Sequence, residues 1–216
     1  ARSPSKTIPR KGRPPLTRTG ALEALRLIEA TGVRARLVPV PLDLERLARL
    51  LAIAPEADWF LRLAALLRGR LDRVSLLALA ARLRLSNAER DRLLALATLE
   101  LPDPTAGRAA GERLVYRLGF PLARDLLCLA AAERGLPAEA LAALLAELSR
   151  FEPPAFPLGG ADLLARGVPQ GPRLGRLLEA VRAWWEAERF RPDRAACLAR
   201  LDALLAAEAD GRPGPG

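Results

Sequence analysis

Leucine and alanine dominate this chain at helical spacing, and no segment offers the pattern of a strand. Apolar residues make up 50% of the 216 residues, but aromatic residues only 4%, so leucine and alanine supply most of the core and favour helix over sheet. No stretch alternates apolar and polar residues as a half-buried strand would. The sequence therefore predicts an all-α protein, an irregular array of about ten helices without a β-sheet.

Helix boundaries are marked by capping residues, prolines and glycines. Thr19 is a candidate N-cap for a helix over Ala21–Ala30. Asp43 is expected to cap the next helix, and Pro55 is expected to open another as its first residue. Ser86 begins the Ser-Asn-Ala-Glu pattern of a capping box, which opens a helix running to about residue 100. Four more helices are expected over Leu71–Leu83, Gly111–Leu118, Leu122–Arg134 and Ala138–Phe151.

The basic charge of the chain is concentrated at its start. The first 20 residues hold six lysine and arginine side chains and no acidic one, so the remaining 196 residues carry +3 of the net charge of +9. We expect four parts: a basic, disordered leading segment over 1–20, a helical body over 21–150, a C-terminal helical tail over 151–210, and a disordered end over 211–216. Because the chain begins with Ala1 and contains no methionine, we expect that it is not a complete translation product.

Residue types exclude most catalytic centres. The chain has no histidine, so it cannot form a Ser-His-Asp or Cys-His pair or a histidine metal site. No phosphate-binding loop of the GxxxxGK[ST] type occurs. The nearest acidic pairs, Asp43 with Glu45 and Glu56 with Asp58, lie at expected helix starts, where a carboxylate favours the helix dipole. We therefore predict no catalytic residue and no metal site in this chain.

The cysteines and the apolar runs bear on the cellular location. Cys128 and Cys197 are far apart and fall within apolar helical patterns, so unpaired packing thiols are expected rather than a disulfide. No apolar run approaches the roughly 20 residues that span a bilayer. These features predict a cytoplasmic protein without a membrane partner.

One segment departs from the leucine and alanine pattern and places glycine and proline at definite intervals. It covers residues 159–178 and reads GGADLLARGVPQGPRLGRLL. A short helix is expected over 161–166 and begins near Gly160, with Asp162 in its first turn. Gly167 is expected to end this helix in the left-handed conformation.

A second helix is expected after a short connector, with Gly171 as its N-cap and Pro172 as its first residue. Its apolar residues recur at i, i+3, i+4, i+7, i+10 and i+11, which predicts one buried face. The members of this face are Leu174, Leu177, Leu178, Val181, Trp184 and Trp185.

The start of this second helix, from its N-cap Gly171 to Arg176, is the candidate binding site for an RNA backbone. The backbone amides of Arg173, Leu174 and Gly175 are expected to be free there, with the guanidinium groups of Arg173 and Arg176 beside them, an arrangement suited to phosphate. A glycine within the helix costs about 1 kcal/mol relative to alanine, which makes sense if an RNA backbone must approach closely at Gly175. The alternative is that Gly175 allows two helices to pack tightly and that Gly171 and Pro172 form an ordinary turn.

The block resembles the GxDLxxxGxxPGPxxGxxL signature in the C-terminal region of bacterial class II CCA-adding enzymes, the tRNA nucleotidyltransferases related to bacterial poly(A) polymerases. It departs from that signature at Gln170. Three more segments are similar to the family in the same order, so that the resemblance covers about residues 21 to 205. They are ATGVRARLVP at 30–39, RLRLSNAERDRLLAL at 82–96 and WWEAERFRPDRAACLARL at 184–201.

The resemblance implies that this chain is the body and tail that grip the acceptor and T arms of tRNA during CCA addition to its 3′ end. The family's catalytic head, with its metal-binding carboxylates, and its nucleotide-selecting neck motif have no counterpart here. The chain alone is therefore expected to be inactive and to hold no cofactor. A nucleotidyltransferase head encoded upstream would supply the chemistry, with Mg²⁺, ATP and CTP.

Two other classes of function stay open. A helix-hairpin-helix-like DNA-binding module also places a glycine loop and a helix N-terminus on phosphates. A helical scaffold for protein partners would instead be expected to show a repeat of fixed period, and none is found in the sequence. Binding to tRNA, to duplex DNA or to neither separates these three functions.

Overall fold

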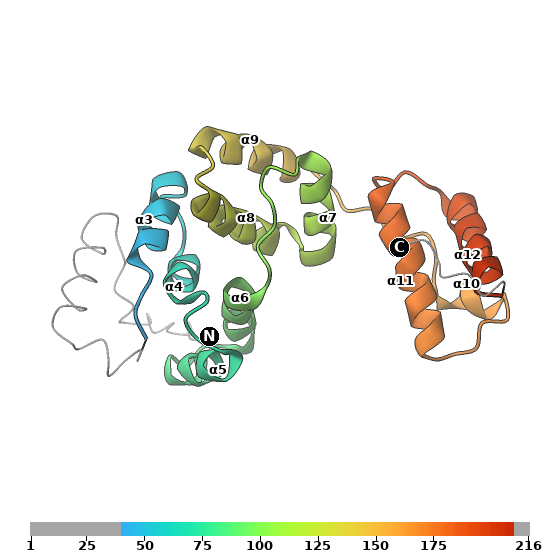
Figure 1. The fold of residues 1–216 in the computed structure, drawn as a ribbon, viewed down its shortest axis with the longest axis horizontal. Helices are drawn as coiled ribbons and strands as arrows, with labels where there is room; N and C mark the ends of the chain where they lie inside the picture. Colours follow the sequence, from blue (N-terminus) through green and yellow to red (C-terminus); the bar gives the residue numbers. More distant parts are fainter. Residues whose placement is uncertain (1–39, 210–216) are drawn as a thin grey trace, which may run out of the picture. The chain divides into compact units, whose positions relative to one another are not determined.

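The computed structural model describes residues 40–209, which form ten α-helices and no strand (Figure 1). The prediction of an all-α protein is therefore confirmed for the described part of the chain. The expected helix over Ala21–Ala30 with its N-cap Thr19, the leading segment 1–20 and the similar segment at 30–39 lie outside the described residues, as does the end at 211–216.

The helices form two compact units. Within the described residues, the first unit contains residues 40–105 and 121–146, and the second contains residues 106–120 and 147–209. The helix α7 (Arg108–Leu118) thus belongs to the second unit although α8 (Phe120–Arg134) and α9 (Ala138–Leu148) follow it in sequence. The expected division of the chain near residue 150 does not include this interleaving.

The first unit begins with four helices whose starts are fixed by polar side chains: α3 (Leu44–Ile53), α4 (Trp59–Leu67), α5 (Arg73–Arg82) and α6 (Asn87–Thr98). The carboxylate of Asp43 accepts a hydrogen bond from the Arg46 amide at 2.9 Å. Ser86 forms the expected capping box, in which its backbone amide donates to the Glu89 carboxylate at 2.8 Å. These caps supply acceptors for amides that have no partner within the helix.

The prediction that Pro55 opens a helix is wrong. Pro55 lies in a turn, and α4 begins at Trp59, where the carboxylate of Asp58 accepts a hydrogen bond from the Leu61 amide at 2.9 Å. A proline at the first helical position only removes one amide hydrogen that would have no partner, whereas an aspartate N-cap supplies an acceptor for an amide that remains. The stronger local signal therefore sets the start of the helix.

Asp125 on α8 is the most deeply buried acid of the first unit, with 0% of its surface exposed. Arg92 on α6 and Arg124 both donate hydrogen bonds to its carboxylate, and Arg92 also donates to Asp58 at 2.6 Å. A buried carboxylate is tolerated only when it is paired in this way. The network ties α6 to α8 and to the start of α4.

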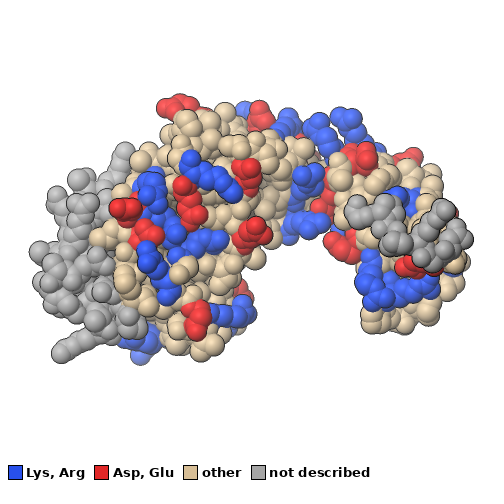
Figure 2. All heavy atoms as spheres, viewed as in Figure 1, with Lys and Arg blue, Asp and Glu red and all other residues tan. Residues whose placement is uncertain are grey.

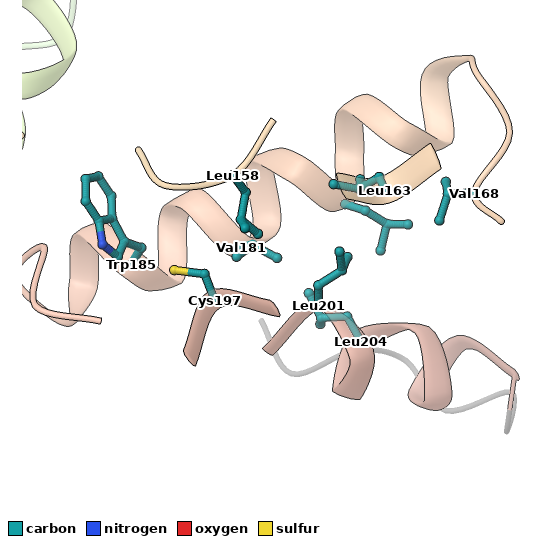
Figure 3. Close-up of a cluster of buried hydrophobic side chains, with 9 residues drawn as sticks. Leu158, Leu163, Val168, Val181, Trp185, Cys197, Leu201 and Leu204 are labelled. Atoms are coloured by element: carbon teal, nitrogen blue, oxygen red, sulfur yellow. The ribbon is translucent and has the colours of Figure 1, made fainter. Parts of the chain in front are cut away.

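The second unit is built from α7, α10 (Gly160–Leu164), α11 (Pro172–Ala187) and α12 (Arg194–Ala209). Figure 3 shows apolar side chains of α10, α11 and α12 directed toward one another. Trp185 lies at the end of this core, and its indole N–H donates to the carbonyl of Pro192 at 2.9 Å. Tyr116 of α7 packs edge-to-face on Trp185, with ring centroids 5.7 Å apart, so α7 shares the aromatic end of the core.

The expected apolar face of α11 is present, but its two tryptophans differ. Leu177, Val181 and Trp185 are buried, and Leu174, Leu178 and Trp184 are partly buried at the edges of the face. Most of the surface of Trp184 is buried, as expected, but Trp184 is more exposed than Trp185. The indole of Trp184 lies under the guanidinium of Arg200, 5.9 Å from the ring centroid.

Both cysteines are free thiols buried in apolar surroundings, Cys128 in the first unit and Cys197 in the second. This confirms the expectation of packing thiols. Burial raises the pKa of the Cys128 thiol to about 11, so the thiol is neutral and unreactive at physiological pH.

Candidate nucleic-acid interface

The glycine- and proline-rich block folds as a short helix, a reversal and a long helix. The first helix, α10, covers Gly160–Leu164 and continues as turns to Gly167, whose φ of +77° is the left-handed conformation expected there. The next residue, Val168, turns back into the core and donates its amide hydrogen to the carbonyl of Leu163 at 3.1 Å. Gly167 is therefore required by the backbone reversal rather than by a ligand.

Asp162 caps the start of α10 and ties it to α12. Its carboxylate accepts a hydrogen bond from the amide of Gly159 at 2.8 Å, and it pairs with Arg194 at the start of α12. The Arg194 guanidinium, followed by the Gly159 amide, lowers the pKa of Asp162 below its ordinary value. Asp162 thus lies in the first turn of α10, the position that the sequence predicts for it.

Gly160 has a modest packing role in the same motif. A Cβ added at Gly160 would lie 3.8 Å from the Cδ2 atom of Leu174, which is an ordinary van der Waals distance. The two helices of the block therefore approach each other here, but not so closely that glycine is required.

The long helix α11 starts as the sequence predicts. Gly171 is its N-cap, with a φ of +149°, and Pro172 is its first residue. That φ lies in a region of backbone conformation that residues other than glycine rarely adopt. Glycine followed by proline therefore fixes the point at which the helix begins and leaves its first turn exposed.

Gly175 lies in this exposed first turn, and nothing within the described chain explains why it is a glycine. A Cβ added there would meet no atom within 4 Å, and its backbone shows no positive φ. The alternative that Gly175 allows two helices to pack tightly is therefore not supported. One part of the candidate site needs correction, because the Gly175 amide is not free: it donates to the carbonyl of Gly171 at 3.5 Å. The amides left for a ligand are those of Arg173 and Leu174.

The two arginines beside this helix start differ in their partners. Arg173 donates to the carboxylate of Glu208 on α12, at 2.8 Å from Nη2 and 3.1 Å from Nε. Both side chains of this pair are nearly half exposed, and exposed ion pairs contribute only about 0–1 kcal/mol. Arg176 is exposed and forms no ion pair or hydrogen bond with any described residue. A phosphate could therefore engage Arg176 directly and compete with Glu208 for Arg173.

Charge around the block is mixed. Arg166 pairs with Asp202 at 2.5 Å, and Arg194 pairs with Asp162, so two of the nearby arginines are already neutralised. Figure 2 shows basic and acidic side chains interspersed over the visible face rather than gathered into one basic surface. Attraction of a polyanion by this unit thus depends on a few individual side chains.

Comparison of the chain with protein-family models and with curated proteins finds no match in either set. Across residues 40–209 no group of three or more histidine, cysteine, aspartate or glutamate side chains is arranged to hold a metal ion. Nor does that part of the chain contain a helix both long and apolar enough to cross a membrane.

Sequence reasoning missed one polar constellation in the second unit. Glu186 on α11 is buried and accepts a hydrogen bond from Arg117 of α7 at 2.7 Å. The two residues are 69 positions apart, so no local pattern pairs them. The only available signal was that Glu186 directly follows two tryptophans on the apolar side of a helix.

Proposed function

We propose that the second unit binds the sugar-phosphate backbone of tRNA through the first turn of α11. The observation that carries this proposal is the open surface at Gly175, where nothing in the described chain occupies the space of a side chain. Beside it are the exposed Arg176, which pairs with no described residue, and the amides of Arg173 and Leu174, which have no partner within residues 40–209. This arrangement suits a phosphate that approaches the backbone closely: Gly175 has no side chain in the way, and the two amides and the Arg176 guanidinium can donate hydrogen bonds to it.

Such a contact would recognise shape and charge rather than sequence. Phosphate contacts position a nucleic acid without reading its bases. We propose further that this unit is the tail, and the first unit the body, of a protein of the CCA-adding tRNA nucleotidyltransferase family. That assignment rests on the resemblance of the block and of the segments at 30–39, 82–96 and 184–201, and it implies a cytoplasmic protein.

In this function the chain grips tRNA and does not transfer nucleotides. A nucleotidyltransferase head on a preceding segment or a separate polypeptide would hold Mg²⁺, ATP and CTP. The pure chain is accordingly expected to add no CMP or AMP to tRNA. Nucleotide addition by the pure chain would contradict this assignment.

Replacement of Gly175 by valine tests the contact. The new side chain fills the open space at the helix start, so we expect tRNA binding to weaken at least about tenfold, or 1.4 kcal/mol. The fold should be retained, because valine and glycine differ little in their cost to an exposed helix. Ala180→Val, also at an exposed position of α11, is the matched control and should bind tRNA like the unaltered chain.

Duplex DNA and tRNA compared in the same assay separate the alternatives. Preference for tRNA over duplex DNA of equal length is expected. Equal or tighter binding of duplex DNA would favour the helix-hairpin-helix-like module, and binding of neither would favour a protein scaffold. If the Gly175→Val and Ala180→Val variants bind tRNA with equal affinity, the proposed contact at Gly175 is contradicted.

A further inference from the structure

The helix α5 of the first unit is apolar on its outer side as well as on the side that packs in the core. Leu76, Leu79 and Ala80 form the buried side. Four exposed apolar residues recur at i, i+3, i+4 and i+7 and form what we call the outer face of α5: Val74, Leu77, Ala78 and Ala81. A surface helix needs one apolar stripe to pack on its core, so the core does not account for this second stripe.

The outer face exposes large apolar side chains. Val74 is 74% exposed and Leu77 is 37% exposed. A valine is also less favourable than alanine in an exposed helix, because its branched side chain loses freedom against the preceding turn. Single exposed apolar residues are common, but a continuous group of them is typical of a contact surface.

Basic side chains border the outer face on both edges. Arg73 lies four positions before Leu77 on the helix, and residues at this spacing are neighbours. Arg82 lies four positions after Ala78, on the other edge, and both arginines are exposed. Two copies of this face would bring like charges together, whereas an apolar segment that carries acidic residues would bring opposite charges together.

The described part of the chain begins beside α5. Val40 and Leu42 pack on a cluster of buried leucines that includes Leu79 of α5. Residues 31–39 directly precede Val40, and they span at most about 30 Å when extended. That reach is about twice the length of α5, so a segment that ends at residue 30 can lie along the outer face.

We propose that the outer face of α5 is covered by the segment Ala21–Ala30 of the same chain, which lies outside the described residues. The sequence predicts a helix over this segment, equal in length to α5. Four of its apolar residues have the spacing of the outer face, i, i+3, i+4 and i+7: Ala21, Ala24, Leu25 and Ile28. The segment carries two acids, Glu23 and Glu29, and one basic residue, Arg26, so its net charge is opposite to that of the arginines beside the outer face. This contact lies in the first unit and does not depend on RNA binding at α11.

Alkylation of a cysteine at position 74 of the full chain tests the contact. The rate of reaction with iodoacetamide is measured for Val74→Cys alone and for Val74→Cys combined with Leu25→Asp and Ile28→Asp. If the segment covers the outer face at least about nine-tenths of the time, the thiol reacts at least about tenfold more slowly in the first protein than in the second. The native Cys128 of the same unit is buried, so it should stay unmodified in both proteins and thereby show that the unit is folded.

A matched control adds the same two charges to the other side of the segment. Leu22→Asp and Ala30→Asp lie outside the apolar stripe, so the thiol at position 74 should stay protected. Equal rates for Val74→Cys with and without Leu25→Asp and Ile28→Asp would overturn the inference. Protection that increases with protein concentration would also overturn it, because the occupant would then be a second copy of the chain.

Cross-linking gives a second readout that needs no disruptive substitution. Leu25→Cys and Leu77→Cys place one thiol on each stripe of the same chain. Packed helices lie about 8–10 Å apart, so a bis-maleimide of about that length should join the two thiols within one chain. Arg26→Cys with Leu77→Cys is the control and should react more slowly, because Arg26 lies on the other side of the predicted helix. Equal reaction of the two pairs, cross-links between chains only, or no cross-link would contradict the proposed contact.

Discussion

Two glycines on helices of the second unit are predicted to respond in opposite ways to alanine. At Gly175 a Cβ would meet no atom within 4 Å, whereas at Gly111 on α7 it would lie 2.7 Å from Cδ1 and 2.8 Å from Cδ2 of Leu148. Leu148 is 1% exposed, so its methyl groups have little space into which they can move. Gly175→Ala should therefore stabilise the protein, and Gly111→Ala should not.

The magnitudes follow from two effects. Alanine is favoured over glycine in a helix by up to about 1 kcal/mol, and this gain applies to both positions. Overpacking of a buried site costs about 1–3 kcal/mol, and this loss applies to Gly111 alone. The two variants should thus differ by about 1–3 kcal/mol in the free energy of unfolding, with Gly175→Ala the more stable.

Urea unfolding of both variants, followed by tryptophan fluorescence, measures this difference. Both glycines lie in the second unit, so the same transition reports on both. Equal stabilisation by the two substitutions would refute the close packing of α7 on Leu148. Destabilisation by Gly175→Ala would refute the open first turn of α11, on which the proposed RNA contact depends.

Two more predictions concern the core and the pH dependence of the same unit. Trp185→Ala should cost about 3–5 kcal/mol, because the ring is 2% exposed and packs in the aromatic end of the core. Trp184→Ala should cost clearly less in the same urea assay, and equal losses would show that the helix is rotated from the described position. Because the pKa of Asp162 is lowered in the folded state, its contribution to stability is present above about pH 4, the value for an unfolded aspartate, and is lost as the pH falls through the lower folded value. In the Asp162→Asn variant, the free energy of unfolding should therefore fall less steeply as the pH is lowered below about 4. The same pH dependence in the variant and the unaltered chain would contradict the pairing of Asp162 with Arg194.

The parts of the fold that were predictable depend on residues near one another in sequence. The caps at Asp43 and Ser86, the left-handed Gly167 and the start of α11 at Gly171 each involve a few consecutive residues, so the sequence pattern carries the whole physical cause. Pro55 shows the limit of such reasoning. Two residues that favour a helix start, Pro55 and Asp58, lie three positions apart, and the helix begins after Asp58.

The parts that were missed depend on contacts between distant residues. The association of α7 with the second unit rests on Gly111 against Leu148 and on Tyr116 against Trp185. The pairing of Arg117 with the buried Glu186 joins two helices in the same way. Helical periodicity identifies which face of a helix is buried, but it does not identify the helix that covers that face. The open space at Gly175 likewise becomes visible only when its surroundings are known.

The salt dependence of tRNA binding tests the proposed phosphate contact most directly. The variant with Arg173→Gln and Arg176→Gln is compared with Arg73→Gln and Arg84→Gln, which removes two exposed arginines of the first unit. Each lost phosphate contact lowers the slope of log affinity against log salt by nearly one unit. We predict that the first variant binds all tRNAs more weakly, with a slope reduced by about one to two units, while the control stays close to the unaltered chain. The same affinity and the same slope for both double variants would show that the first turn of α11 does not contact the RNA backbone.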